Sequence, residues 1–325
     1  MDIQGFTDYL HTRGCNGGQV EKSIAIVQEF LDFMQAGQLP PTAETAWAYS
    51  RKLIAEDRNS EANYFALARY HRFIRANELF VGFLELIDGG EVNENLYRRV
   101  GERFGEEAQA EFFAGIGVAP YGTPTPEKPA YLQPVIERLE AHLGKDATAE
   151  FLSPSLRDLP DESYYPEREK YRRSDSMDAY LVQRKQEFVD GLESCLNENR
   201  LFFSQEITRE VIDFVINDPE IGGGRREGNI IYETKIPYMT ARYLAETDPV
   251  LKRYYACHCP WARTAIRKGD VHVAETFCYC SGGFHKKAFE IIFNRPLRVE
   301  VLESAAAGQD RCRFAIYLPE DFADL

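Results

Sequence analysis

The stretch LRVEVLESAAAGQDRCRFAIYL, residues 297–318, decides the class of fold. Two runs rich in Val, Leu, Ile and Phe, 297–304 and 311–318, flank Gly308-Gln309-Asp310, a glycine-containing turn signal. Apolar runs separated by such a turn are typical of a β-hairpin. The chain is therefore predicted to close with two antiparallel strands, and its fold class depends on what precedes them.

Helices and further strands precede this hairpin. Apolar spacing and breaker residues predict helices over 177–197, 207–216, 237–246 and 283–293, and strands over 230–235, 253–259 and 271–280. Cys312 and Phe314 lie on one face of the last strand, because side chains alternate along a strand. The C-terminal half is thus predicted to be an α+β domain with an antiparallel sheet.

The N-terminal part is predicted to be all-helical. Apolar residues recur at three- and four-residue spacing over 6–10, 20–33, 43–55 and 61–77, with glycine and proline breaks between them. An internal echo follows, GEEAQAEF at 105–112 and GKDATAEF at 144–151, which predicts two related helical hairpins. The overall fold class is α+β, with an N-terminal all-α helical region first.

A polar, tyrosine-rich stretch separates the two parts. DESYYPEREKYRRSDSM, residues 161–177, has no apolar period, which is typical of an exposed connection. We therefore predict a helical region at 1–160, a linker at 161–177 and an α+β ligand- or metal-binding domain at 178–325. The tyrosines of 161–177 could instead pack between the two parts and hold them together.

Composition narrows the classes of partner. The 325 residues carry a formal net charge of −14, so nucleic acid and anionic membranes are unlikely partners, since both attract a surplus of Lys and Arg. No apolar run reaches membrane-spanning length and the first residues lack a signal-peptide pattern, so we expect a cytoplasmic protein without membrane contact. A small-molecule ligand is expected, and the helical region is a candidate surface for a protein partner or a homo-oligomer.

Four of the seven cysteines form two Cys-X-Cys pairs, Cys257 with Cys259 and Cys278 with Cys280. On neighbouring strands each pair would present both sulfurs on one face, so four thiols would converge. Such a group could bind one zinc or iron ion, act as a thiol relay, or supply a nucleophile. The alternative is four small buried side chains in an ordinary core.

Other residues near the pairs are candidates for a ligand pocket. Trp261, Arg263 and His285 are predicted ligand-binding residues, and an arginine fork could pair with a carboxylate. Lys235 and Tyr238 could line the same pocket, while His258 is predicted to point away from the sulfurs and His272 is a possible metal ligand. The remaining cysteines are predicted to be structural: Cys15, Cys195 and Cys312.

Two resemblances add expectations. The block FCYC at 277–280, FHKKAFE at 284–290 and the closing hairpin with its Gly-x-Asp-x-Cys-x-Phe run resemble the vinyl-reductase-type and L-2-amino-thiazoline-4-carboxylic acid hydrolase-like small-molecule-binding domains. This implies a compact α+β ligand-binding fold over about 178–320. The helices GFTDYLHTRG, VQEFLDFM and YFALARYHRFIR resemble the helical N-terminal domain of tyrosine recombinases.

The sequence thus favours a cytosolic metal- or small-ligand-binding protein, a sensor or accessory factor, that uses the four-cysteine cluster. One alternative is a cysteine-dependent hydrolase of a small carbon-nitrogen or thio-heterocyclic substrate, and the other is a thiol redox-sensing interaction module. No dinucleotide fingerprint, kinase signature or zinc-protease helix is present.

Overall fold

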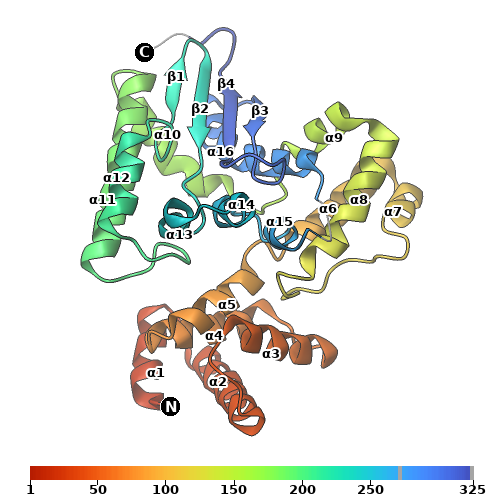
Figure 1. Cartoon of the computed structure of the whole chain (residues 1–325), viewed down its shortest axis with the longest axis vertical. Coiled ribbons are helices and arrows are strands. Elements are labelled where there is room, and N and C mark those ends of the chain that lie inside the picture. The colour runs from red at the N-terminus through yellow and green to blue at the C-terminus, as the bar shows by residue number, and fades with distance from the viewer. Residues whose placement is uncertain (270–272, 323–325) are drawn as a thin grey trace.

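The computed structural model describes residues 1–269 and 273–322. It confirms the α+β class, with a mostly helical N-terminal part followed by a C-terminal part that holds a four-stranded antiparallel sheet. Figure 1 shows the first five helices gathered below the rest of the molecule, with the sheet above them. The candidate site lies in the upper part.

The first five helices are α1 (Ile3–Thr12), α2 (Gly17–Gly37), α3 (Ala43–Ala55), α4 (Glu61–Phe73) and α5 (Asn77–Ile87). Their starts follow the expected chemistry, since Asn16 and Gln19 form a reciprocal capping box at the start of α2. The apolar stripes meet in a buried core, which we call the N-terminal core and which includes Phe30, Tyr49, His71 and Phe83.

The next four helices form the two related hairpins that the echo predicts. They are α6 (Val92–Phe104), α7 (Glu106–Phe112), α8 (Lys128–Leu143) and α9 (Lys145–Leu152). One glycine joins the helices of each pair, with φ 88° and ψ 168° at Gly105 and φ 80° and ψ 163° at Gly144. Glycine suits both positions because a positive φ is strained for other residues.

The segment 161–177, predicted as a linker, is mostly helical. It contains the short 3₁₀ helix η1 (Asp161–Tyr164) and α10 (Tyr165–Arg172), and α11 (Met177–Asn197) follows before α12 (Arg209–Asn217). Tyr171 and Met177 are buried, and α10 packs on a later helix, α16. The segment is therefore part of the folded body, and independent folding of the two sides stays a prediction.

The sheet contains β1 (Arg225–Glu227), β2 (Ile230–Thr234), β3 (Arg298–Glu303) and β4 (Arg313–Tyr317), in the order β1-β2-β4-β3. The predicted closing hairpin is confirmed, because β3 and β4 pair antiparallel. Helices α10, α11 and α16 (Cys278–Phe293) contribute to one apolar core with the sheet; its members include Tyr180, Ile231, Phe289, Val299 and Phe314.

Two predicted strands are wrong. Residues 253–259 form the last turn of α14 (Pro249–Ala256) and the loop after it. The helix starts there because Pro249 occupies its first turn and the Asp248 carboxylate accepts hydrogen bonds from two backbone N–H groups. The described part of 271–280 holds the 3₁₀ helix η2 (Glu275–Phe277) and the start of α16, and 270–272 lie outside the described residues.

The two remaining helices, α13 (Thr240–Ala245) and α15 (Arg263–Lys268), flank α14. Helices α6–α9 share one buried core with residues 256–305, which we call the thiol core because it contains Cys257 and Cys280. Residues from both sides of the predicted linker therefore build the surroundings of the cysteines.

Candidate functional site

Five of the seven cysteines lie where three segments meet. Cys257 and Cys259 lie in the loop after α14, Cys278 and Cys280 in the first turn of α16, and Cys312 directly before β4. All five are free thiols. Cys257 and Cys280 belong to the thiol core, and Cys259 and Cys312 pack against it.

The prediction that the thiols converge from two neighbouring strands is wrong. Neither pair lies on a strand, and residues two apart on a helix of 3.6 residues per turn point in different directions. Cys280 faces the segment after α9, where its Sγ accepts a hydrogen bond from the Leu156 N–H at 3.2 Å. Cys278 instead faces the loop before β4, where it hydrogen-bonds with the Ser304 hydroxyl.

The charges of three thiols act on Cys257, and we call the four together the thiol tetrad: Cys257, Cys259, Cys278 and Cys312. Cys259 also interacts electrostatically with Cys280. Burial raises the pKa of Cys257 well above its ordinary value, and the charges of the other three thiols raise it further. Burial likewise raises the pKa of Cys278 to about 12, with contributions from Cys312 and Cys259. Cys312, predicted to be structural, thus lies among the candidate ligands.

Each sulfur of the thiol tetrad has its own hydrogen-bond donor. The donors are the Cys259 N–H for Cys257, the Trp261 N–H for Cys259, the Ser304 hydroxyl for Cys278 and the Ala305 N–H for Cys312. Hydrogen bonds to sulfur favour the thiolate, which is the form that binds metals. They partly oppose the effect of burial.

Lys235 brings a positive charge to the same place. Its Nζ donates to Ser281 Oγ at 2.7 Å, and its backbone N–H donates to the Cys312 carbonyl at 2.9 Å. The effect of burial is larger than that of this ammonium group, so the pKa of Cys259 rises to about 11. The unliganded thiols are therefore protonated at neutral pH.

The described side chains are not arranged as ligands of one ion. Within residues 1–269 and 273–322, no group of three or more His, Cys, Asp or Glu side chains is placed to hold a metal. A change of χ1 rotamer moves a cysteine sulfur without moving the backbone. A coordination site at the thiol tetrad would therefore require side-chain rotation.

Trp261 and Arg263, predicted to bind a ligand, contact the N-terminal part instead. The Trp261 indole N–H donates to the Gly89 carbonyl at 2.8 Å. Arg263 Nη2 lies 2.5 Å from the Glu85 carboxylate at the end of α5, and the guanidinium stacks over Tyr238 at 3.8 Å. Both side chains are buried. They anchor α5 to the thiol core, and a ligand-binding role for them stays a prediction.

Two of the candidate histidines are held by hydrogen bonds. His258 Nε2 lies 2.5 Å from the Ile236 carbonyl oxygen, and burial lowers the pKa of this ring to about 3. His285 Nδ1 lies 2.6 Å from the Glu233 carboxylate, and the ring stacks on Phe314. His272 lies outside the described residues.

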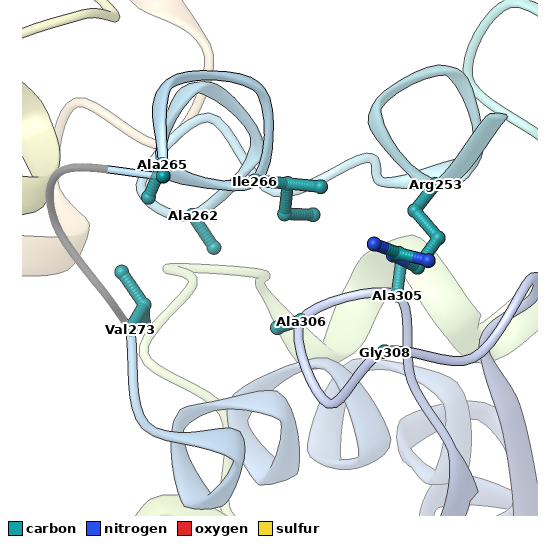
Figure 2. A pocket seen from close by; sticks show the side chains of 9 residues that line it. Arg253, Ala262, Ala265, Ile266, Val273, Ala305, Ala306 and Gly308 are labelled. Atoms are coloured by element: carbon teal, nitrogen blue, oxygen red, sulfur yellow. The ribbon is translucent and has the colours of Figure 1, made fainter. Parts of the chain in front are cut away.

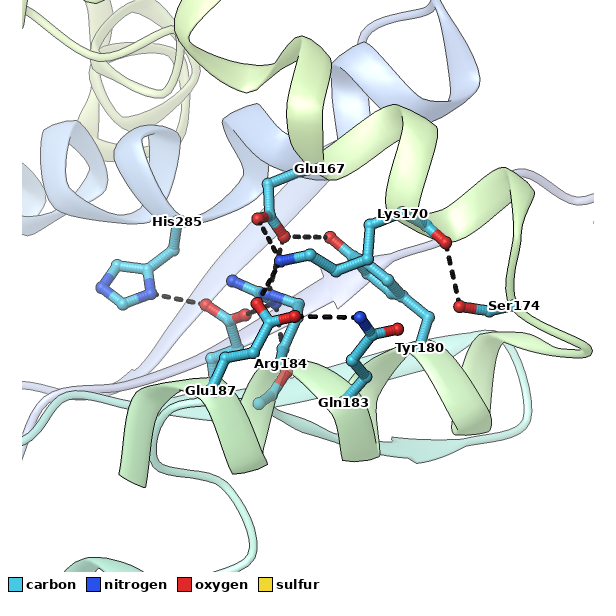
Figure 3. Close-up of polar contacts among 10 residues, drawn as sticks. Glu167, Lys170, Ser174, Tyr180, Gln183, Arg184, Glu187 and His285 are labelled. Atoms are coloured by element: carbon cyan, nitrogen blue, oxygen red, sulfur yellow. Dashed lines mark hydrogen bonds and ion pairs between the residues drawn. The ribbon is translucent and has the colours of Figure 1, made fainter. Parts of the chain in front are cut away.

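His285 is the end of a larger polar network (Figure 3). The Glu233 carboxylate also accepts a hydrogen bond from Arg184, which pairs with Glu167, and Tyr180 donates to Glu167 at 2.9 Å. The sequence analysis missed this network because its partners come from several separate elements. Glu233 and Lys235 share one face of the predicted strand 230–235. Two charged side chains on one face of a strand were the available signal of a polar site there.

Residues 237–322 match the profile of a family of unknown function, DUF6144. This match contains every cysteine of the thiol tetrad. No curated protein and no solved structure matches the chain. The resemblances to vinyl-reductase-type and hydrolase-like domains and to tyrosine recombinases therefore stay predictions.

None of the helices in the described part of the chain combines the length and the apolar character needed to span a bilayer.

Proposed function

We propose that the thiol tetrad binds one zinc or iron ion and that the protein acts as a metal-binding sensor or accessory factor. The observation that carries this proposal is the meeting of Cys257, Cys259, Cys278 and Cys312 from three segments, each beside its own hydrogen-bond donor. Four thiolates suit one tetrahedral zinc ion, and cysteine thiolates also bind iron.

The surroundings of the sulfurs support a bound cation. A divalent ion with four thiolates keeps a net negative charge, which the ammonium group of Lys235 would partly offset. Backbone and hydroxyl donors to the sulfurs orient metal ligands and tune the metal. Cys280 is left out of the proposed ligand set because its sulfur is directed at Leu156 and Ser155, although its charge also raises the pKa of Cys259.

Metal analysis of anaerobically purified variants tests the proposal. We expect about one zinc or iron ion per chain in the wild type, in agreement with one tetrahedral site. Cys312→Ser should lose most of the metal, whereas Cys280→Ser should retain it. Cys195→Ser is the matched control, because Cys195 is a buried cysteine in a different core.

Two outcomes would contradict parts of this account. A folded wild type that binds neither Zn²⁺ nor Fe²⁺ and whose tetrad thiols all titrate freely would remove the metal proposal. Metal loss from Cys280→Ser but not from Cys312→Ser would restore the ligand set predicted from the Cys-X-Cys pairs.

A cysteine-dependent hydrolase has less support from the described residues. A cysteine nucleophile reacts as the thiolate, and its pKa is normally lowered by its surroundings. Burial raises the pKa of all five clustered thiols, to about 11 for Cys259 and about 12 for Cys278. The same neighbouring thiols could serve a redox-sensing module, and chelation before thiol alkylation would distinguish that function from metal binding.

A further inference from the structure

A cavity of about 190 Å³ lies between α14, α15 and the loop that precedes β4 (Figure 2). Small and apolar side chains form most of its wall, together with a single arginine among the described residues. Residues that line it include Arg253, Ala262, Ala265, Ile266, Ala305 and Ala306. The wall thus combines small apolar side chains with polar surface that includes one guanidinium group.

Arg253 has no side-chain hydrogen bond or ion pair within the described part of the chain. Its side chain reaches from α14 into the cavity, and the residue is only partly exposed. Other arginines of this half are paired, such as Arg263 with Glu85 and Arg313 with Glu220. A partly buried, unpaired guanidinium beside a cavity is a site that an anion would complete.

We propose that this cavity binds a small carboxylate with a short apolar body. The guanidinium fork of Arg253 matches the two oxygens of a carboxylate, and the alanine and isoleucine side chains match the apolar body. The cavity is smaller than sites for drug-sized molecules, so a ligand of about six to ten non-hydrogen atoms is expected.

The cavity shares its wall with the thiol tetrad. Ala305 lines the cavity and donates its backbone N–H to Cys312 Sγ, and Ala262 lines the cavity and donates its N–H to the Cys259 carbonyl at 3.2 Å. A bound carboxylate would therefore lie beside the sulfurs. The proposal does not depend on metal binding, and the two can fail separately.

Calorimetric titration of the full chain with three probes of equal chain length tests the charge requirement. We expect hexanoate to bind, and hexan-1-ol and hexylamine to bind at least about tenfold more weakly, because only hexanoate can pair with Arg253. The Arg253→Met variant should lose this preference. Arg267→Met is the matched control, because Arg267 lies on α15 and stacks over Tyr254.

A second variant tests the location independently of the charge. Ala306→Leu should fill part of the cavity without removing Arg253, and it should weaken hexanoate binding by at least about threefold through steric overlap. Three results would overturn the proposal: no hexanoate binding at about 10 mM, where even weak ligands saturate; equal affinity of wild type for hexanoate and hexan-1-ol; or unchanged hexanoate affinity in Arg253→Met. Hexanoate binding by protein that takes up no metal would leave this proposal standing and remove only the metal site.

Discussion

The N-terminal core and the thiol core are both closely packed, but they hold their polar groups differently. In the N-terminal core, the Ser50 hydroxyl bonds Tyr64 and a backbone carbonyl, and His71 is an isolated ring among aromatic side chains. The thiol core holds free thiols and lies against the buried Arg263–Glu85 ion pair. We propose that the first core is structural and that the second binds a ligand or a metal ion.

This contrast is the reason for proposing a binding function for the thiol core and not for the N-terminal core. Apolar and aromatic packing accounts for the first core, although Trp47 Nε1 and His71 Nε2 are buried there without a hydrogen-bond partner among the described residues. The thiol core instead contains groups whose pKa values burial raises, such as Cys257 and Cys280, beside hydrogen-bond donors that favour their charged form. Groups held in this way are candidates for function because a ligand can change their charge state.

The largest expected effect is on independent folding. A fragment of residues 1–88 should fold alone, because every buried hydrophobic residue of the N-terminal core lies within it and, among the described hydrophobic residues, only Tyr121 and Leu201 pack against the core from outside. A fragment of residues 178–325 should not fold, because α6–α9 supply much of the thiol core. Circular dichroism melts of both fragments check this. A cooperative transition in fragment 178–325 would show that the predicted linker does separate two domains.

Loss of the Arg263–Glu85 ion pair between the two cores should have the next largest effect, on the free energy of unfolding. Arg263→Met leaves the Glu85 carboxylate buried without its charge partner, which should lower the free energy of unfolding by about 3 to 5 kcal/mol. The double variant with Glu85→Gln should recover part of this loss. Urea unfolding of both variants measures it. Equal stability of wild type and Arg263→Met would show that the ion pair does not join the cores.

A smaller effect is expected from pH in the N-terminal core. Burial lowers the pKa of His71 to about 4, so the unfolded chain takes up a proton more readily than the folded one as pH falls below the ordinary histidine value. The stability due to neutral His71 is present near pH 7 and is lost as pH falls from about 6.5 towards about 4. Between pH 7 and 5 this loss is about 2 kcal/mol.

The His71→Phe variant should lack this part of the pH dependence. The chain has two tryptophans: Trp47 packs against the N-terminal core and Trp261 lies in the thiol core. Fluorescence in a Trp261→Phe background therefore reports on the N-terminal core. If stability falls with pH in the same way with and without the His71→Phe substitution, the buried imidazole is not the source of the effect.

The sequence predicted the N-terminal core better than the thiol core for a physical reason. Helix periodicity is local, so α2, α3 and α11 could be predicted within a few residues. The convergence of the thiols depends on contacts that no local pattern contains, such as Ser304 with Cys278. The strand predicted over 253–259 failed because the Asp248-Pro249 helix start was not given its weight.

The ligand-pocket residues show the same limit. Arg263 and Trp261 were correctly placed near the cysteines in sequence, but their partners Glu85 and Gly89 lie more than 170 residues away in the chain. Arg253 gave no sequence signal because an isolated arginine is usually solvated. Its unpaired position is visible only once the fold has placed it beside the cavity.

X-ray absorption at the edge of the bound metal tests the central claim most directly. The account predicts a shell of about four sulfur atoms at about 2.3 Å for zinc, in the wild type and in Cys280→Ser. In any metal retained by Cys312→Ser, one sulfur should be replaced by a lighter ligand. A wild-type shell made only of nitrogen and oxygen at about 2.0 to 2.2 Å would contradict the claim.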